Sequence, residues 1–241
     1  VGGDGAIYAI RHKLYEKMLE TDINDFVNPL QIVLKGYRGV YEPGAICWEE
    51  SAGNFQKEFR RKTRIVNRSF SGLLRLKAVL NPLRTGVFSF EMLSHKLLRW
   101  LTPVFGISLV ISCMALALLN VKFFLCVSLC ITLFFWFAYA GYLLSSLNIP
   151  FFLYYPYYFV LVNIASLMGV HRSLKGKIQT TWDTVRTVDR DKSYSGARSL
   201  IHVLFFISVF FFLQVTGKFI SVALLPDKVI YWSAALLIVY G

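Results

Sequence analysis

Residues 123–170 read FFLCVSLCITLFFWFAYAGYLLSSLNIPFFLYYPYYFVLVNIASLMGV and hold no Lys, Arg, Asp, Glu or His in 48 positions. As a single helix this stretch would rise about 72 Å, whereas the hydrocarbon core of a bilayer is about 30 Å thick. The stretch therefore predicts at least two membrane-associated segments. Asn148, Pro150 and Pro156 are the natural breaks between them, and the aromatic residues at 151–159 suit a membrane–water interface.

Apolar stretches on both sides of this run predict further crossings. Residues 101–121 are 21 positions without a formal charge, which is about the length that one crossing needs. Residues 199–217 form another candidate, and residues 229–240 are a shorter apolar stretch. The chain is 56% hydrophobic and 17% charged, against about 25% charged in an average soluble domain. These features predict an α-helical multi-pass region in the cell membrane and exclude a disordered chain, a small disulfide scaffold and a cytosolic globule.

The net charge of +12 is concentrated in two basic blocks. Residues 57–99 carry eleven Lys and Arg against two Glu, and residues 171–198 carry seven against three Asp. Basic residues beside crossings are retained on the cytoplasmic side, so we expect both blocks there, with membrane lipids rather than nucleic acid as a partner. Both blocks share one side only if the number of crossings between them is even, with one apolar segment re-entrant or interfacial. Full crossing by all three segments is the alternative.

The first hundred residues predict a cytosolic part of mixed α/β structure. Strands are expected at residues 6–10 and 37–41, short helices at 11–19 and 22–35, and a long amphipathic helix from residue 51 to about 77. The predicted order of regions is a cytosolic α/β domain at 1–50, interfacial helices at 51–98, a transmembrane region at 99–170, a basic cytosolic loop at 171–198 and a further transmembrane region at 199–241.

Asp25 stands at the start of one predicted helix, in the segment Asp22-Ile23-Asn24-Asp25. Capping accounts for this spacing, because Asp and Asn are preferred at helix starts and suit the helix dipole. The functional alternative is that one carboxylate beside a pocket takes the proton of an attacking hydroxyl group. Metal binding is not indicated, because the four histidines show no paired ligand spacing and Asp189-Arg190-Asp191 reads as a solvated loop.

A basic stripe is predicted along one face of the long amphipathic helix, at spacings of four, three and four residues: Lys57, Arg61, Arg64 and Arg68. Apolar residues occupy another face of this helix. The pattern fits a helix in the membrane interface, with its arginines towards lipid headgroups. Arginine also offers paired donors to the oxygens of a diphosphate, and the two interpretations are compatible.

Four segments, in one order and spacing, resemble the membrane-bound family 2 glycosyltransferases, the group of cellulose, hyaluronan and chitin synthases. Residues 3–11, GDGAIYAIR, are similar to the GxxGAxYAxR turn of this family, and residues 23–26, INDF, to its acidic motif. Residues 36–45, GYRGVYEPGA, are similar to its GYR-x-x-YEP-x-A segment, and residues 61–65, RKTRI, to its [QR]xxRW motif. In the last motif Ile65 stands where tryptophan is usual.

The resemblance implies a partial GT-A-like α/β domain, the C-terminal half only, followed by membrane helices. The absent first half would hold most ligands of a Mg or Mn ion, so this fragment alone would be inactive. The resemblance also implies residue roles: Asp25 as catalytic base, Arg61 and Arg64 on the donor diphosphate, Gly3, Asp4, Gly5 and Ala6 at the acceptor site, and Trp182, Thr184 and Arg186 in a nucleotide-proximal cytosolic loop.

The activity implied is inverting transfer of a sugar from a nucleotide-diphosphate donor to a polysaccharide or lipid-linked acceptor at the membrane, with the catalytic part cytoplasmic. The replacement of tryptophan by Ile65 favours addition of a single sugar over processive extension. A non-catalytic membrane transporter or assembly subunit is the alternative, because composition alone would allow it. A transporter would show ionisable residues within its crossings, and residues 123–170 have none.

Overall fold

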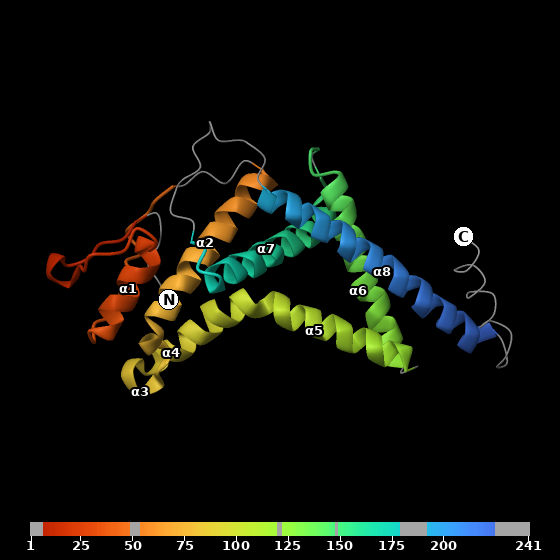
Figure 1. Cartoon of the computed structure of the whole chain (residues 1–241), viewed down its shortest axis with the longest axis horizontal. Helices are drawn as coiled ribbons and strands as arrows, with labels where there is room; N and C mark the ends of the chain where they lie inside the picture. The colour runs from red at the N-terminus through yellow and green to blue at the C-terminus, as the bar shows by residue number, and fades with distance from the viewer. Residues whose placement is uncertain (1–6, 49–53, 120–121, 148, 179–191, 225–241) are drawn as a thin grey trace. The chain divides into compact units, whose positions relative to one another are not determined.

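The structure is a computed structural model that describes residues 7–48, 54–119, 122–147, 149–178 and 192–224. Within these residues the protein is helical and contains no strand (Figure 1). The chain divides into two compact units, one of Val1–Val104 with Leu161–Ala197 and the other of Phe105–Val160 with Arg198–Gly241.

The predicted α/β half-domain at residues 1–50 is wrong. Both segments expected as strands are irregular over their described residues, and the helix expected at 11–19 is reduced to one turn, η1 (His12–Leu14). A strand is stable only where neighbouring strands pair with its backbone and cover one face. The side chains of Val40 and Tyr41 are instead 83% and 85% exposed. The pattern of these segments therefore reflects a local preference for extended backbone. Among the described residues, no sheet forms that would turn this preference into a strand.

The first long helix, α1 (Asn24–Leu34), confirms the helix predicted at residues 22–35. Its end follows from Gly36, which has a φ of 82°, a conformation that glycine adopts without strain. The Gly36 N–H donates to the Val33 carbonyl at 2.9 Å, and the Tyr37 N–H donates to the Ile32 carbonyl at 3.2 Å. These two bonds form a Schellman cap, which satisfies carbonyl groups at the helix end and stops the helix here.

The amphipathic helix α2 (Phe55–Arg75) is also confirmed. It begins where the Asn54 side chain accepts a hydrogen bond from the Lys57 N–H at 2.8 Å, an N-cap of the preferred residue type. Its apolar face is buried, whereas the opposite face carries the basic residues. The helical periodicity therefore predicted this element correctly, and the structure adds the cap at Asn54.

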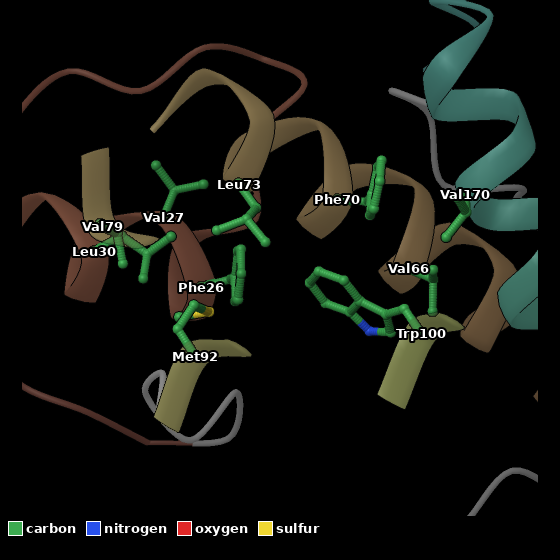
Figure 2. Packing of buried hydrophobic residues seen from close by; sticks show 10 residues of the cluster. All are labelled: Phe26, Val27, Leu30, Val66, Phe70, Leu73, Val79, Met92, Trp100 and Val170. Carbon is green, nitrogen blue, oxygen red and sulfur yellow. The ribbon is translucent and has the colours of Figure 1, made fainter. Parts of the chain in front are cut away.

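One hydrophobic core holds the first unit together (Figure 2). It joins α1 and α2 to η2 (Lys77–Leu80), α4 (Val87–Met92), the start of α5 (Arg99–Leu118) and the end of α7 (Phe151–Leu174). The centre of the Trp100 ring lies 5.7 Å from the centre of the Phe26 ring and 6.0 Å from that of the Phe70 ring. The ring planes are inclined to each other by 60° and 66°. Such ring pairs contribute about 0.5–1.5 kcal/mol beyond the area that they bury. The short helix α3 (Pro82–Thr85) and the π-helical turn η3 (Leu93–Leu98) complete the path from α2 to α5.

Helices α2 and α7 approach closely because position 169 is a glycine. A Cβ atom on Gly169 would lie 2.8 Å from the Val66 Cβ and 2.9 Å from the Thr63 carbonyl oxygen. Beside this contact the buried Asn67 donates through Nδ2 to the carbonyls of Gly169, at 3.3 Å, and Lys177, at 3.1 Å. The end of α7 is therefore bonded to the middle of α2.

Replacing Gly169 by alanine is expected to destabilise the first unit by about 1–3 kcal/mol, the usual cost of overpacking a close contact. The added methyl group would meet backbone as well as side-chain atoms, so neither helix can yield by a rotamer change alone. Gly196 in α8 (Lys192–Leu224) is the matched control, because no described atom lies within 4 Å of its Cβ position. Chemical denaturation in detergent measures both variants, and equal stabilities would contradict the close packing.

Four helices of the described part are long and apolar enough to cross a membrane: Val87–Leu118, Phe123–Leu143, Phe151–Leu174 and Tyr194–Gly217. The long apolar run is divided between α6 (Lys122–Leu143) and α7, which confirms a break at Pro150, directly before α7, whereas Asn148 lies outside the described residues. Pro156 is not a break, because it lies inside α7, where a proline near the helix start disrupts few hydrogen bonds. The number of full crossings and the cytoplasmic side of the basic blocks remain predictions.

The second unit is packed through aromatic and small residues. On α6, a Cβ atom at Gly141 would lie 2.5 Å from the Leu153 carbonyl oxygen of α7. Where α6 contacts α8, the Tyr139 ring stacks on the Phe205 ring with 3.9 Å between the ring centres. The Tyr139 hydroxyl lies 3.1 Å from His202 Nδ1. These contacts give the polar groups partners within the apolar helices, where an unsatisfied group is costly.

Candidate functional site

Asp25 lies half-buried in the first turn of α1 and is the acidic residue of that turn. The free N–H groups of a helix start favour a carboxylate at this position. Lys96 of η3 lies near enough that its positive charge is attracted by Asp25, and its Nζ stands 5.7 Å from the centre of the Phe26 ring. The candidate base is therefore placed by α1 and faces a cation from the segment that leads into α5.

Asp22, the other acid of this segment, has a structural role. Its side chain is 3% exposed and accepts from Arg75 Nη2, with both carboxylate oxygens at 2.5 Å. It also accepts from the Leu19 N–H at 2.9 Å. A carboxylate committed to these donors is poorly placed to take a proton from a substrate. The structure thus separates two acids that sequence spacing left equivalent, and it leaves Asp25 as the candidate base.

Arg68 does not belong to an open basic stripe. Its guanidinium donates to the carbonyls of Glu20 and Thr21, each at 2.9 Å, and to the carbonyl of Asp22. Together with the Arg75–Asp22 pair, these bonds hold the loop before α1 against α2, and we name this set the arginine clamp. Helical spacing alone did not predict this clamp, although two arginines seven residues apart on one helix could have pointed to a shared partner.

Arg61 and Arg64 occupy successive turns of α2. Arg61 Nε lies 3.0 Å from Glu58 Oε2, and the Arg61 side chain is still 41% exposed. Lys62 shares the same Glu58 carboxylate at 3.5 Å. An ion pair this exposed contributes about 0.2–1 kcal/mol, so an incoming diphosphate can compete for Arg61. Arg64 is half-buried one turn further along.

The structure brings the helices of the predicted base and the predicted diphosphate ligands together. Phe26 and Val27, which follow Asp25, pack in the same core as Val66 of α2, and a Cβ on Gly72 would lie 2.9 Å from Val27 Cγ2. Asp25 and Arg64 therefore stand on two helices that contact each other within one unit. Their joint action on one substrate is a proposal that this packing supports.

The remaining predicted site residues lie outside the described residues: Gly3, Asp4, Gly5, Ala6, Trp182, Thr184 and Arg186. Their roles stay predictions. The chain just after the glycine-rich turn does reach α1, because Asn28 Nδ2 donates to the Tyr8 hydroxyl at 3.3 Å. In the described part of the chain no group of three or more His, Cys, Asp or Glu side chains could hold a metal ion. These residues do not form a site for the implied Mg or Mn, and no step below depends on one.

These features define a helical membrane protein with an acid at the start of a helix that packs against an arginine-bearing amphipathic helix. The sequence model of glycosyl transferase family group 2 matches residues 5–139, which is more than half of the chain and includes Asp25, Arg61 and Arg64. The chain belongs to this family. Comparison with curated proteins and with solved structures gave no match. The likeness to cellulose, hyaluronan and chitin synthases, and the C-terminal-half assignment, remain predictions.

Proposed function

We propose that the protein carries out inverting transfer of a sugar from a nucleotide-diphosphate donor to a polysaccharide or lipid-linked acceptor at the membrane. The observation that carries the proposal is the placement of Asp25 at the start of α1, which packs on the helix that bears Arg61 and Arg64. All three residues lie within the range of the family match, which favours sugar transfer over the transporter or assembly-subunit alternative.

The proposed reaction is a single displacement. Asp25 takes the proton of an acceptor hydroxyl as its oxygen forms a bond to the anomeric carbon of the donor sugar. The bond from that carbon to the diphosphate oxygen breaks, and the diphosphate leaves with the electron pair. Arg61 and Arg64 stabilise the negative charge that develops on the leaving diphosphate. Attack from the face opposite the leaving group inverts the anomeric configuration.

Lys96 supports the role of Asp25 in this scheme. Its positive charge attracts Asp25, so a cation lies near the carboxylate that acts as the base in this scheme. Asp22 cannot replace it while it is bound by Arg75 and by the Leu19 N–H.

The test is a transfer assay with the complete enzyme in membranes. Radiolabelled nucleotide sugars are offered with glycan and lipid-linked acceptors, and NMR of the product determines the configuration of the new linkage. Inversion of the donor configuration is expected. A retained configuration, or no transfer from any nucleotide sugar, would contradict the proposal.

Replacing Arg64 by alanine is expected to weaken binding of the nucleotide diphosphate by about ten- to a hundredfold, since a hydrogen bond to a charged group contributes about 1.5–3 kcal/mol. Calorimetric titration of the complete enzyme with a nucleoside diphosphate measures the effect. Lys57→Ala is the matched control, because Lys57 lies on the same helix and is exposed at its start. Equal affinities for the Arg64 variant and the unaltered enzyme would remove the diphosphate role.

A further inference from the structure

A polar cavity of about 570 Å³, open to the surface, lies where the chain enters α5. Its lining comes from three consecutive elements, α4, η3 and the first residue of α5: Glu91, Ser94, His95, Lys96 and Arg99. The π-helical turn η3 contributes three of the five residues, and such turns occur frequently at functional sites.

The lining of the cavity carries an excess of positive charge, with Lys96 and Arg99 against the single acid Glu91. Lys96 is repelled by Arg99 and attracted by Asp25, which lies outside the lining. Glu91 is the acid of the lining, yet no ion pair joins it or Arg99 to another residue in the described part of the chain. Two neighbouring cations against one acid in the lining favour an anionic ligand, such as a phosphate monoester.

The position of the cavity along the chain selects the kind of molecule that carries this phosphate. Arg99 is the last charged residue before the apolar run of residues 100–121, so the cavity lies at the start of a membrane helix. On the preceding turns the side chains of Val87 and Phe90 are 73% and 62% exposed. A ligand with a charged head and an apolar tail fits such a boundary, because the tail can enter the bilayer while the head remains in the polar cavity.

We propose that this cavity binds the phosphate group of a lipid-linked acceptor, with Lys96 and Arg99 as its ligands. The proposal rests on the proposed function and narrows it, because it selects a lipid-linked acceptor over a neutral glycan. Lys96 connects the two sites, since it lines the cavity and attracts Asp25. The donor diphosphate is assigned to different residues, on α2. The carboxylate of Glu91 repels an anion in the cavity. Removing this charge should therefore strengthen phosphate binding, whereas removing the charge of Lys96 or Arg99 should weaken it.

The experiment measures binding without any sugar transfer. The complete enzyme in nanodiscs of neutral phosphatidylcholine is titrated with farnesyl phosphate and, as a control for the apolar tail, with farnesol. Farnesyl phosphate is expected to bind roughly tenfold or more tightly than farnesol. Arg99→Gln and Lys96→Gln are each expected to weaken its binding by roughly tenfold, and Glu91→Gln is expected to strengthen it. Thermal unfolding of each variant shows that the fold is intact.

Several outcomes would overturn the proposal. Binding of farnesol as tight as that of farnesyl phosphate would contradict it, and so would an Arg99→Gln variant with unchanged affinity. Equal competition by phosphatidylglycerol would show a site for ordinary anionic lipid, and displacement of farnesyl phosphate by uridine diphosphate would show a donor site. Because the readout is binding, a failure here leaves the role of Asp25 intact. Normal transfer by an Asp25→Asn variant would contradict the role of Asp25 and leave phosphate binding intact in turn, so the two proposals fail separately.

Discussion

Asp25→Asn is expected to abolish sugar transfer while leaving donor binding nearly unchanged. The amide has almost the size and shape of the carboxylate, so the start of α1 and its packing on α2 should persist. It cannot accept the proton of the acceptor hydroxyl, and loss of a general base lowers rates by about 10²–10⁴-fold. Transfer rates at saturating donor, together with a titration of nucleoside diphosphate, measure the two properties separately.

Asp22→Asn is the matched comparison for this prediction. It removes an acid three residues away that is bound by Arg75 and the Leu19 N–H, so its main effect should be on the stability of the loop. We expect a lower melting temperature and a smaller loss of transfer than in the Asp25 variant. If Asp25→Asn transferred sugar at the normal rate, or if Asp22→Asn alone abolished transfer, the assignment of the base would be wrong.

The sequence predicted those parts of the fold that depend on local interactions. Gly36 ends α1, as predicted, because it satisfies backbone groups within a few residues of itself. The cap at Asn54 is equally local but was not predicted. The membrane helices followed from the length of the apolar runs, since about 20 apolar residues suffice for a crossing whatever their neighbours are. Motif order also placed Asp25, Arg61 and Arg64 within a range that the family model matches.

The features that the sequence did not reveal depend on contacts between distant residues. The pattern at residues 37–41 resembles a strand, but a strand requires neighbours that no local pattern supplies. Arg68 shares the spacing of Arg61 and Arg64, yet it bonds to carbonyls 46–48 positions earlier in the chain. The close approach of Gly169 to α2 likewise joins segments about a hundred residues apart. Periodicity places a residue on a helix face, whereas its partner is decided by the folded chain.

Arg68→Gln is expected to lower the turnover rate by roughly ten- to a hundredfold while the Michaelis constant for the donor stays nearly constant. Arg68 is a positioning residue, because it touches the loop before α1 and not the reacting groups of the proposed scheme. Its loss frees the carbonyls of Glu20, Thr21 and Asp22 from the arginine clamp. A displacement of only about 1 Å in a catalytic group can cost a hundredfold in rate, and Asp25 follows this loop directly.

The split between the two kinetic constants separates positioning from general damage to the fold. Partial unfolding would reduce the amount of active enzyme, which a melting curve and an active-site titration detect. Arg68→Lys should rescue little of the rate, because an ammonium group lacks the planar fork that reaches several carbonyls at once. Lys57→Gln removes a charge from the same helix at an exposed position and should leave the turnover rate unchanged. A lysine variant that restores full turnover would show that charge near α1, rather than the clamp geometry, holds Asp25 in place.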